Sequence, residues 1–205
     1  MVNMRIIVPT LSNILTGFLA VLIVATPREY IKGFVAYKLG DTTPKQAGRL
    51  SLNPFVHLDP LGTISFILFE FGWTRSVPIR YWKLKNKKKD LLKISLLGPA
   101  VSFILFFLCG LIASHLPEED FWWFLMVKAA KYNLTYALFS LFPIPPLDGS
   151  KILASLLPDK YMEWLVKYEV YGVLFMIALL VLWIIPLVMN PFVRFIDGFV
   201  WMIVR

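Results

Sequence analysis

Residues 26 to 41 have the sequence Thr-Pro-Arg-Glu-Tyr-Ile-Lys-Gly-Phe-Val-Ala-Tyr-Lys-Leu-Gly-Asp, and they guide the interpretation of the whole chain. Arg28, Glu29 and Lys32 have the spacing of the zinc-binding helix pattern His-Glu-x-x-His. In that pattern the two imidazoles bind the metal from one helix face, and the Glu activates a metal-bound water. Arg28 and Lys32 are cations without a free lone pair at neutral pH. The stretch therefore predicts the frame of a zinc site without its two histidine ligands.

The composition is that of a membrane protein. Hydrophobic residues make up 58% of the chain and the mean hydropathy is +0.69, more than a soluble domain carries. Four apolar stretches, near residues 6 to 25, 91 to 113, 121 to 142 and 170 to 189, approach the ~20 residues that cross a bilayer. We expect the first of them to remain in the mature chain, because no small-residue cleavage site follows it.

Two shorter apolar segments complete this picture. Residues 61 to 73 are too few to cross a membrane and include Glu70, so we expect a re-entrant or interfacial segment buried against protein. The tail from residue 191 onward is expected to be another such segment or an amphipathic end. The sequence predicts an all-α, polytopic integral membrane protein with about four transmembrane helices and one domain over residues 1 to 205.

The net charge of +8 is unevenly distributed. Cations crowd residues 75 to 93, whereas residues 118 to 120 are all acidic. The positive-inside rule places the 74 to 90 loop in the cytoplasm and the 114 to 120 turn outside, which puts residues 28 to 49 and 143 to 160 on the cytoplasmic side. The basic run from Lys83 to Lys89 is a candidate contact for anionic lipid. No nucleic-acid partner is expected, because no aromatic-interleaved binding module surrounds the run.

Five further blocks follow along the chain in a fixed order. They are Val35-Ala-Tyr-Lys-Leu-Gly-Asp41; Gly48-Arg-Leu-Ser-Leu-Asn-Pro-Phe-Val-His-Leu-Asp-Pro-Leu-Gly-Thr63; Phe71-Gly-Trp with Val77-Pro78; Leu97-Gly-Pro-Ala100; and Phe142-Pro-Ile-Pro-Pro-Leu-Asp-Gly-Ser-Lys-Ile-Leu153. In this order the blocks resemble those of the bacterial site-2 proteases and cover nearly the whole chain. The resemblance implies an all-helical intramembrane zinc metalloprotease fold in a bacterial cell membrane. In that fold the His-Glu-x-x-His helix meets a later Leu-Asp-Gly loop, which supplies the third zinc ligand.

The resemblance also implies a set of site residues. Glu29 has the position of the general base, Asp148 that of the third metal ligand, and Arg28 and Lys32 those of the two lost histidines. Ser140 stands where family members typically have an Asn that helps to hold substrate. The substrate cleft would be completed by residues of the irregular loop that follows: Pro143, Pro146, Leu147 and Gly149, whose flexibility would aim Asp148.

Because the changes fall on the chemical residues and spare the frame, the sequence favours a pseudoprotease. Such a protein would bind or regulate a membrane-embedded peptide segment as its client, without cutting it. Active members of the family use zinc, but no cofactor is expected here.

An active enzyme with a nonstandard zinc site is the alternative. Glu29, His57 and Asp148 would be its ligands, and it would cleave a transmembrane substrate. Arg28 and Lys32 would then stand within about one helical turn of the metal, which costs electrostatic energy. His57 has a simpler interpretation as a residue that organises a turn near the site.

Two hypotheses address the charged residues of the first helix. Thr26, Pro27 and Glu29 have the form of a capping box, which would start a helix at Pro27 and make Glu29 a cap residue. Removal of zinc would also leave Glu29 and Asp148 partly buried without a countercharge. We therefore expect Arg28 or Lys32 to bridge to Asp148 in place of the metal. In the opposing interpretation both cations extend to the membrane interface and contact nothing.

Overall fold

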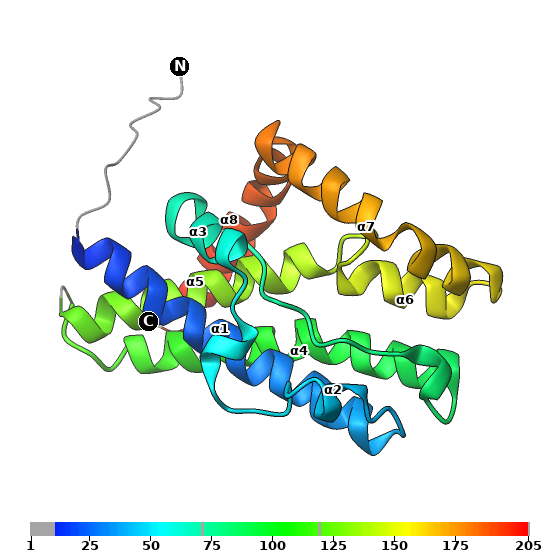
Figure 1. Ribbon diagram of the computed structural model, residues 1–205. Coiled ribbons are helices and arrows are strands. Elements are labelled where there is room, and N and C mark those ends of the chain that lie inside the picture. Colours follow the sequence, from blue (N-terminus) through cyan, green and yellow to red (C-terminus); the bar gives the residue numbers. More distant parts are fainter. Residues whose placement is uncertain (1–10, 71, 119, 205) are drawn as a thin grey trace.

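The computed structural model describes residues 11 to 70, 72 to 118 and 120 to 204, and this part of the chain folds into helices joined by irregular segments, without strands (Figure 1). The predicted all-α fold is therefore confirmed for the described residues. Six long or medium helices carry the architecture: α1 (Leu11–Lys38), α4 (Lys87–Ala113), α5 (Phe121–Ser140), α6 (Asp148–Leu156), α7 (Lys160–Val181) and α8 (Ile184–Val204). Four further helices lie between α1 and α4: α2 (Thr43–Gln46), η1 (Pro54–His57), α3 (Pro60–Phe69) and η2 (Tyr81–Lys83).

Helix α1 continues through Pro27 without interruption, so the expected break before the charged residues is absent. The predicted capping box is wrong for the same reason. Thr26 lies well inside the helix, where its hydroxyl donates a 2.9 Å hydrogen bond to the carbonyl oxygen of Leu22. An interior proline costs a helix about 3 kcal/mol. The apolar residues before Pro27 are packed against α4 and α5, and this burial outweighs the cost.

Two of the helices are long and apolar enough to cross a membrane, namely α1 and α4. They correspond to the first two of the four expected spans, although residues 6 to 10 of the first lie outside the described residues. The third expected span falls in α5 and stays a prediction. The fourth, residues 170 to 189, is not one continuous helix, because α7 ends at Val181 and α8 begins at Ile184. The segment predicted to be re-entrant contains the ten-residue helix α3, and the apolar tail is the second part of α8.

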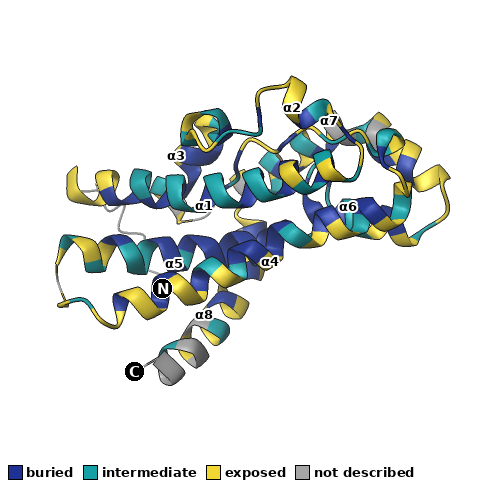
Figure 2. Cartoon of the chain, turned by 90° about the horizontal axis from the view of Figure 1, so that it is seen from below, coloured by how far each residue is buried: buried dark blue, intermediate teal, exposed yellow. Residues whose placement is uncertain are grey.

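Helices α1, α4 and α5 pack side by side, and α6 lies on α4 (Figures 1 and 2). One hydrophobic cluster joins α1 to α5 and α8, with Val21 and Val24 among its buried members. A second cluster joins α1 to the start of α4 and to α6 and α7, with Ala36 and Ile94 among its members. Between Val24 and Ala36, the buried face of α1 is charged. The fold thus places a polar patch of α1 between two apolar cores.

Candidate functional site

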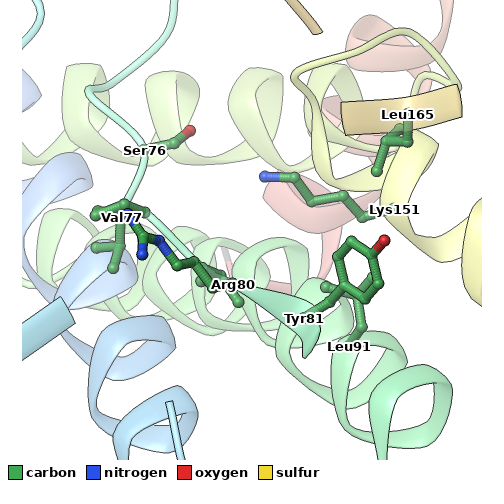
Figure 3. A pocket seen from close by; sticks show the side chains of 9 residues that line it. Ser76, Val77, Arg80, Tyr81, Leu91, Lys151 and Leu165 are labelled. Atoms are coloured by element: carbon green, nitrogen blue, oxygen red, sulfur yellow. The ribbon is translucent and has the colours of Figure 1, made fainter. Parts of the chain in front are cut away.

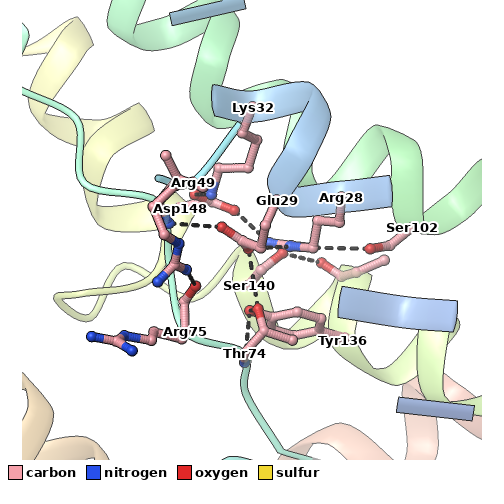
Figure 4. A network of polar contacts seen from close by, with 12 residues as sticks. Arg28, Glu29, Lys32, Arg49, Thr74, Arg75, Ser102, Tyr136, Ser140 and Asp148 are labelled. Atoms are coloured by element: carbon pink, nitrogen blue, oxygen red, sulfur yellow. Dashed lines mark hydrogen bonds and ion pairs between the residues drawn. The ribbon is translucent and has the colours of Figure 1, made fainter. Parts of the chain in front are cut away.

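The polar patch belongs to a group of four buried charged residues, which we call the charged cluster: Arg28, Glu29, Lys32 and Asp148 (Figure 4). The first three come from adjacent turns of α1, and Asp148 is the first residue of α6. Their relative exposures are 1%, 0%, 2% and 3%. Buried charges are costly unless they are paired, so the contacts within the cluster decide whether this arrangement is stable.

Asp148 is bound by both cations of α1. The Lys32 ammonium donates to Oδ1 at 2.6 Å, and Nη2 of Arg28 donates to Oδ2 at 2.5 Å. The predicted bridge to Asp148 is therefore confirmed, and it is made by both cations. The opposing interpretation, in which they extend to the interface and contact nothing, is wrong. Burial alone would raise the pKa of Asp148, but the charges of Lys32 and Arg28 hold the pKa below its ordinary value of 3.8.

Arg28 connects Asp148 to two further helices. Its Nη1 donates to the hydroxyl of Ser102 on α4 at 2.9 Å. The guanidinium lies 3.9 Å from the ring centroid of Tyr136 on α5, a cation–π contact in a buried setting. Its Nε is 3.4 Å from Oε1 of Glu29. One side chain of α1 thus contacts α4, α5 and α6.

Glu29 holds the extended segment that follows α3. Its Oε1 accepts from the hydroxyl of Thr74 at 3.1 Å, and its Oε2 accepts from the backbone N–H of Val77 at 2.9 Å. The Thr74 side chain is in turn 2.8 Å from the hydroxyl of Tyr136. Glu29 is therefore a buried anchor and not a helix cap. Sequence reasoning missed Thr74 and Tyr136, and Thr74 could have been found because it directly follows the Phe-Gly-Trp block.

Two glycines make room for the cluster and its loop. A Cβ atom added to Gly98 of α4 would stand 2.4 Å from Oδ2 of Asp148 and 2.8 Å from Nη2 of Arg28. A Cβ added to Gly149 would stand 2.0 Å from the carbonyl oxygen of Leu141. Gly149 lies in the first turn of α6 and not in a left-handed conformation. Its role is close approach of the chain, a correction to the expected conformational one.

The remaining residues that were expected at a substrate cleft lie at the end of α5 and in the connection from α5 to α6. Ser140 is buried at the end of α5, where its hydroxyl donates to the carbonyl oxygen of Ala137 at 2.9 Å. Leu147 is buried directly before α6, Pro146 is half-buried and Pro143 is exposed. The structure therefore brings Ser140 into the interior beside the charged cluster (Figure 4). Leu147 is buried next to Asp148 in the chain, whereas Pro143 lies at the surface.

His57 contacts backbone and organises a turn. Its Nε2 is 2.8 Å from the carbonyl oxygen of Ser51, which fixes Nε2 as the protonated nitrogen because a carbonyl only accepts. The His57 carbonyl accepts from the N–H of Arg75 at 2.9 Å, and the Arg75 carbonyl accepts from the guanidinium of Arg49. The three residues tie the segment after α2 to the extended segment that Glu29 holds.

The donor set of the charged cluster does not fit a zinc ion. Catalytic zinc takes three neutral nitrogen, thiolate or carboxylate ligands and keeps one position open. The cluster offers two carboxylates, and both oxygens of Asp148 already accept from cations that cannot act as ligands. Within residues 11 to 70, 72 to 118 and 120 to 204, His, Cys, Asp and Glu form no group of three or more that could hold a metal ion.

The chain has a curated relative in Bacillus subtilis (strain 168), which bears the name "Putative zinc metalloprotease YwhC". The two are 36% identical over 174 residues, which cover 79% of this chain and 77% of the relative. The chain therefore belongs to the same family as that metalloprotease-like protein. No family model matches the chain, and no solved structure matches it.

Proposed function

We propose that this chain is a non-catalytic member of the intramembrane site-2 protease family, which binds a membrane-embedded peptide segment without cleaving it. One observation carries the proposal: both carboxylate oxygens of Asp148, at the third-ligand position, are occupied by Arg28 and Lys32. The metalloprotease-like relative supports the relationship to a protease family. The two helices long enough to cross a membrane support a location in the bilayer.

The balance of charge accounts for the contact between α1 and α6 in the absence of a metal ion. A zinc dication beside Glu29 and Asp148 would neutralise two carboxylates, and Arg28 and Lys32 supply the same two positive charges. The cluster therefore keeps α1 joined to α6 without a metal. Arg28 and Lys32 stand at the two histidine positions of the pattern and bind Asp148, so the proposal leaves no ligand set for a metal that would activate water. What the frame retains is the irregular loop and the extended segment around it, where a peptide client would bind.

Metal content is the first test. We expect the purified protein to hold no stoichiometric zinc by elemental analysis, because its ligand positions carry cations. The double variant Arg28→His, Lys32→His should gain about one zinc per chain, since it restores the ligand pattern. The matched control is Arg28→Gln, Lys32→Gln, which also removes both charges but adds no ligand and should stay free of zinc.

A cleavage assay separates the proposal from its enzymatic alternative. A synthetic membrane-spanning peptide with a fluorophore and a quencher on either side of its midpoint reports cutting. The same peptide with the fluorophore alone reports binding through its fluorescence anisotropy. We expect binding without cutting by the parent protein. Stoichiometric zinc in the parent, together with cleavage that is lost in His57→Ala, would overturn the proposal in favour of a site built from Glu29, His57 and Asp148.

A further inference from the structure

A cavity of about 520 Å³ lies at the end of α4, between the last residues of that helix, the turn that follows, α5 and the last part of α8. A smaller cavity of about 310 Å³ adjoins the start of α4 and has Lys151 in its lining (Figure 3). The charged cluster contacts α4 between the two cavities, at Gly98 and Ser102. The larger cavity is therefore separate from the site described above.

The larger cavity has a negative charge in its lining. Among the described residues that line it, Glu118 is the one charged side chain. The Glu118 carboxylate is exposed and has no hydrogen-bond or ion-pair partner within the described part of the chain. The cation Lys128 of α5 is held by α1, where its ammonium donates to the Asn13 carbonyl and the Thr16 hydroxyl, both at 3.0 Å. The cavity is thus suited to a cationic ligand.

The rest of the lining decides which kind of cation fits. Trp123 of α5 and Trp201 of α8 are both half-buried and line the cavity from two helices. Indole rings attract cations, and aromatic side chains are the groups with which proteins recognise quaternary ammonium ligands. Calcium and magnesium ions instead take about six oxygen ligands. Besides Glu118, the described lining offers the hydroxyl of Ser114, which already donates to the carbonyl oxygen of Leu111 at 2.8 Å. The lining therefore favours an alkylammonium group over a metal ion.

The cavity lies at the level where a membrane-spanning α4 would leave the bilayer. The candidate span ends at Ala113, which is buried and lines the cavity. A largely exposed turn follows, with acidic residues at 118 to 120, of which residue 119 lies outside the described part. Tryptophan is enriched at this boundary, because its ring is apolar and its N–H is polar. Lipid head groups occupy the same level, and those of zwitterionic phospholipids end in an alkylammonium group.

We propose that this cavity binds the alkylammonium head group of a zwitterionic phospholipid. The ammonium would lie against Trp123 and Trp201, with Glu118 as its countercharge. The carbons of the head group would lie on Leu116 and Val127, the apolar side chains of the lining. Binding here does not depend on the proposed function, because the charged cluster contacts a different part of α4.

Native mass spectrometry of the full chain in detergent tests the site, with phosphatidylcholine, phosphatidylethanolamine and phosphatidylglycerol offered in equal amounts. We expect retention of the first two lipids over phosphatidylglycerol, which has no ammonium group. Glu118→Gln and Trp123→Leu should each lower the retention of phosphatidylcholine on the order of tenfold, because each removes a group that attracts the cation. The matched controls are Asp120→Asn and Trp122→Leu, which change exposed neighbours outside the lining and should alter retention little.

Folding and the source of the ammonium group are checked separately. Because Glu118 is exposed, Glu118→Gln should keep the Tm of the parent, so that its loss of lipid is not a loss of fold. Millimolar choline should displace phosphatidylcholine from the parent, since it carries the same ammonium group without the acyl chains. Equal retention of phosphatidylglycerol and phosphatidylcholine, or equal losses in Glu118→Gln and Asp120→Asn, would overturn the proposal. Displacement of the lipid by micromolar calcium but not by choline would also overturn it, because the cavity would then bind a metal ion.

Discussion

At the residue scale, Arg28 makes contacts with three different helices. Its guanidinium binds Asp148, the first residue of α6. The planar guanidinium of Arg28 also donates a hydrogen bond to Ser102, and one face of it lies over the ring of Tyr136. A lysine at this position would be a point charge and could not make all three contacts. We infer that arginine at 28 and lysine at 32 have distinct roles.

The balance of charge at Asp148 leads to a prediction that depends on pH. Asp148→Asn leaves Arg28 and Lys32 without their shared countercharge and should destabilise the protein by about 3 kcal/mol or more at neutral pH. Because the folded pKa of Asp148 lies below 3.8, the ionised carboxylate stabilises the protein at every pH above 3.8. That stabilisation is lost as the pH falls through the lowered pKa of Asp148.

Thermal unfolding in detergent checks this prediction. The difference in Tm between the parent and Asp148→Asn should be constant from about pH 5 to 8. It should shrink at pH values below the ordinary pKa of an aspartate carboxyl group. Asp159→Asn is the control, because Asp159 pairs with Lys88 at 2.9 Å but its side chain is 88% exposed, and exposed pairs contribute little. A Tm for Asp148→Asn equal to that of the parent at pH 7 would show that the bridge is not a structural link.

At the element scale, the close approach of α4 to α1 and to the start of α6 depends on a residue without a side chain. Gly98 lies against the contact between Arg28 and Asp148. Gly110 lies on the same helix, and a Cβ added there would meet nothing within 4 Å. Alanine substitutions at these two glycines therefore separate the effect of crowding the ion pair from the effect of helix propensity.

We predict opposite outcomes for the two alanine variants. Gly98→Ala should lower Tm, because its methyl group would push apart the ion pair that joins α1 to α6. Gly110→Ala should leave Tm unchanged or raise it slightly, since alanine favours a helix interior over glycine by up to about 1 kcal/mol. Thermal unfolding of the two purified variants side by side gives the answer, and a Gly98→Ala variant as stable as Gly110→Ala would contradict it.

The helices themselves could be predicted from the sequence, because long apolar runs bounded by charged loops leave few alternatives. The bridge to Asp148 could also be predicted, because charge balance does not depend on exact geometry. The cap at Thr26 was predicted wrongly, since a local pattern of four residues cannot show that the preceding helix is held in place by packing on α5. Tyr136 was missed because a tyrosine inside an apolar helix has the same sequence pattern as a core residue.

At the scale of the whole molecule, the two ends of α4 differ in charge. The helix begins with three lysines and ends before the acidic 118 to 120 turn, of which residue 119 lies outside the described part. If α4 spans the bilayer, the positive-inside rule gives it one orientation, with its start in the cytoplasm. The charged cluster lies against Gly98 in the first half of α4, so it would be nearer to that side of the membrane.

Cysteine labelling tests this orientation. Asn86 and Ser114 flank α4, and both are exposed. In a background with Cys109 replaced by Ala, a membrane-impermeant maleimide should label Ser114→Cys in intact cells and Asn86→Cys only after the cells are permeabilised. The reverse pattern would invert the topology, and labelling of both positions in intact cells would rule out α4 as a span.

The neutral charged cluster also bears on evolution. Its two cations and two carboxylates cancel, so a single change of Arg28 or Lys32 to histidine would leave one buried carboxylate unbalanced while supplying only part of a ligand set. Each one-step intermediate therefore combines lower stability with no catalytic gain. Under the proposed function, we therefore expect descendants of this protein to keep both cations and to diversify through the surfaces they present to partners.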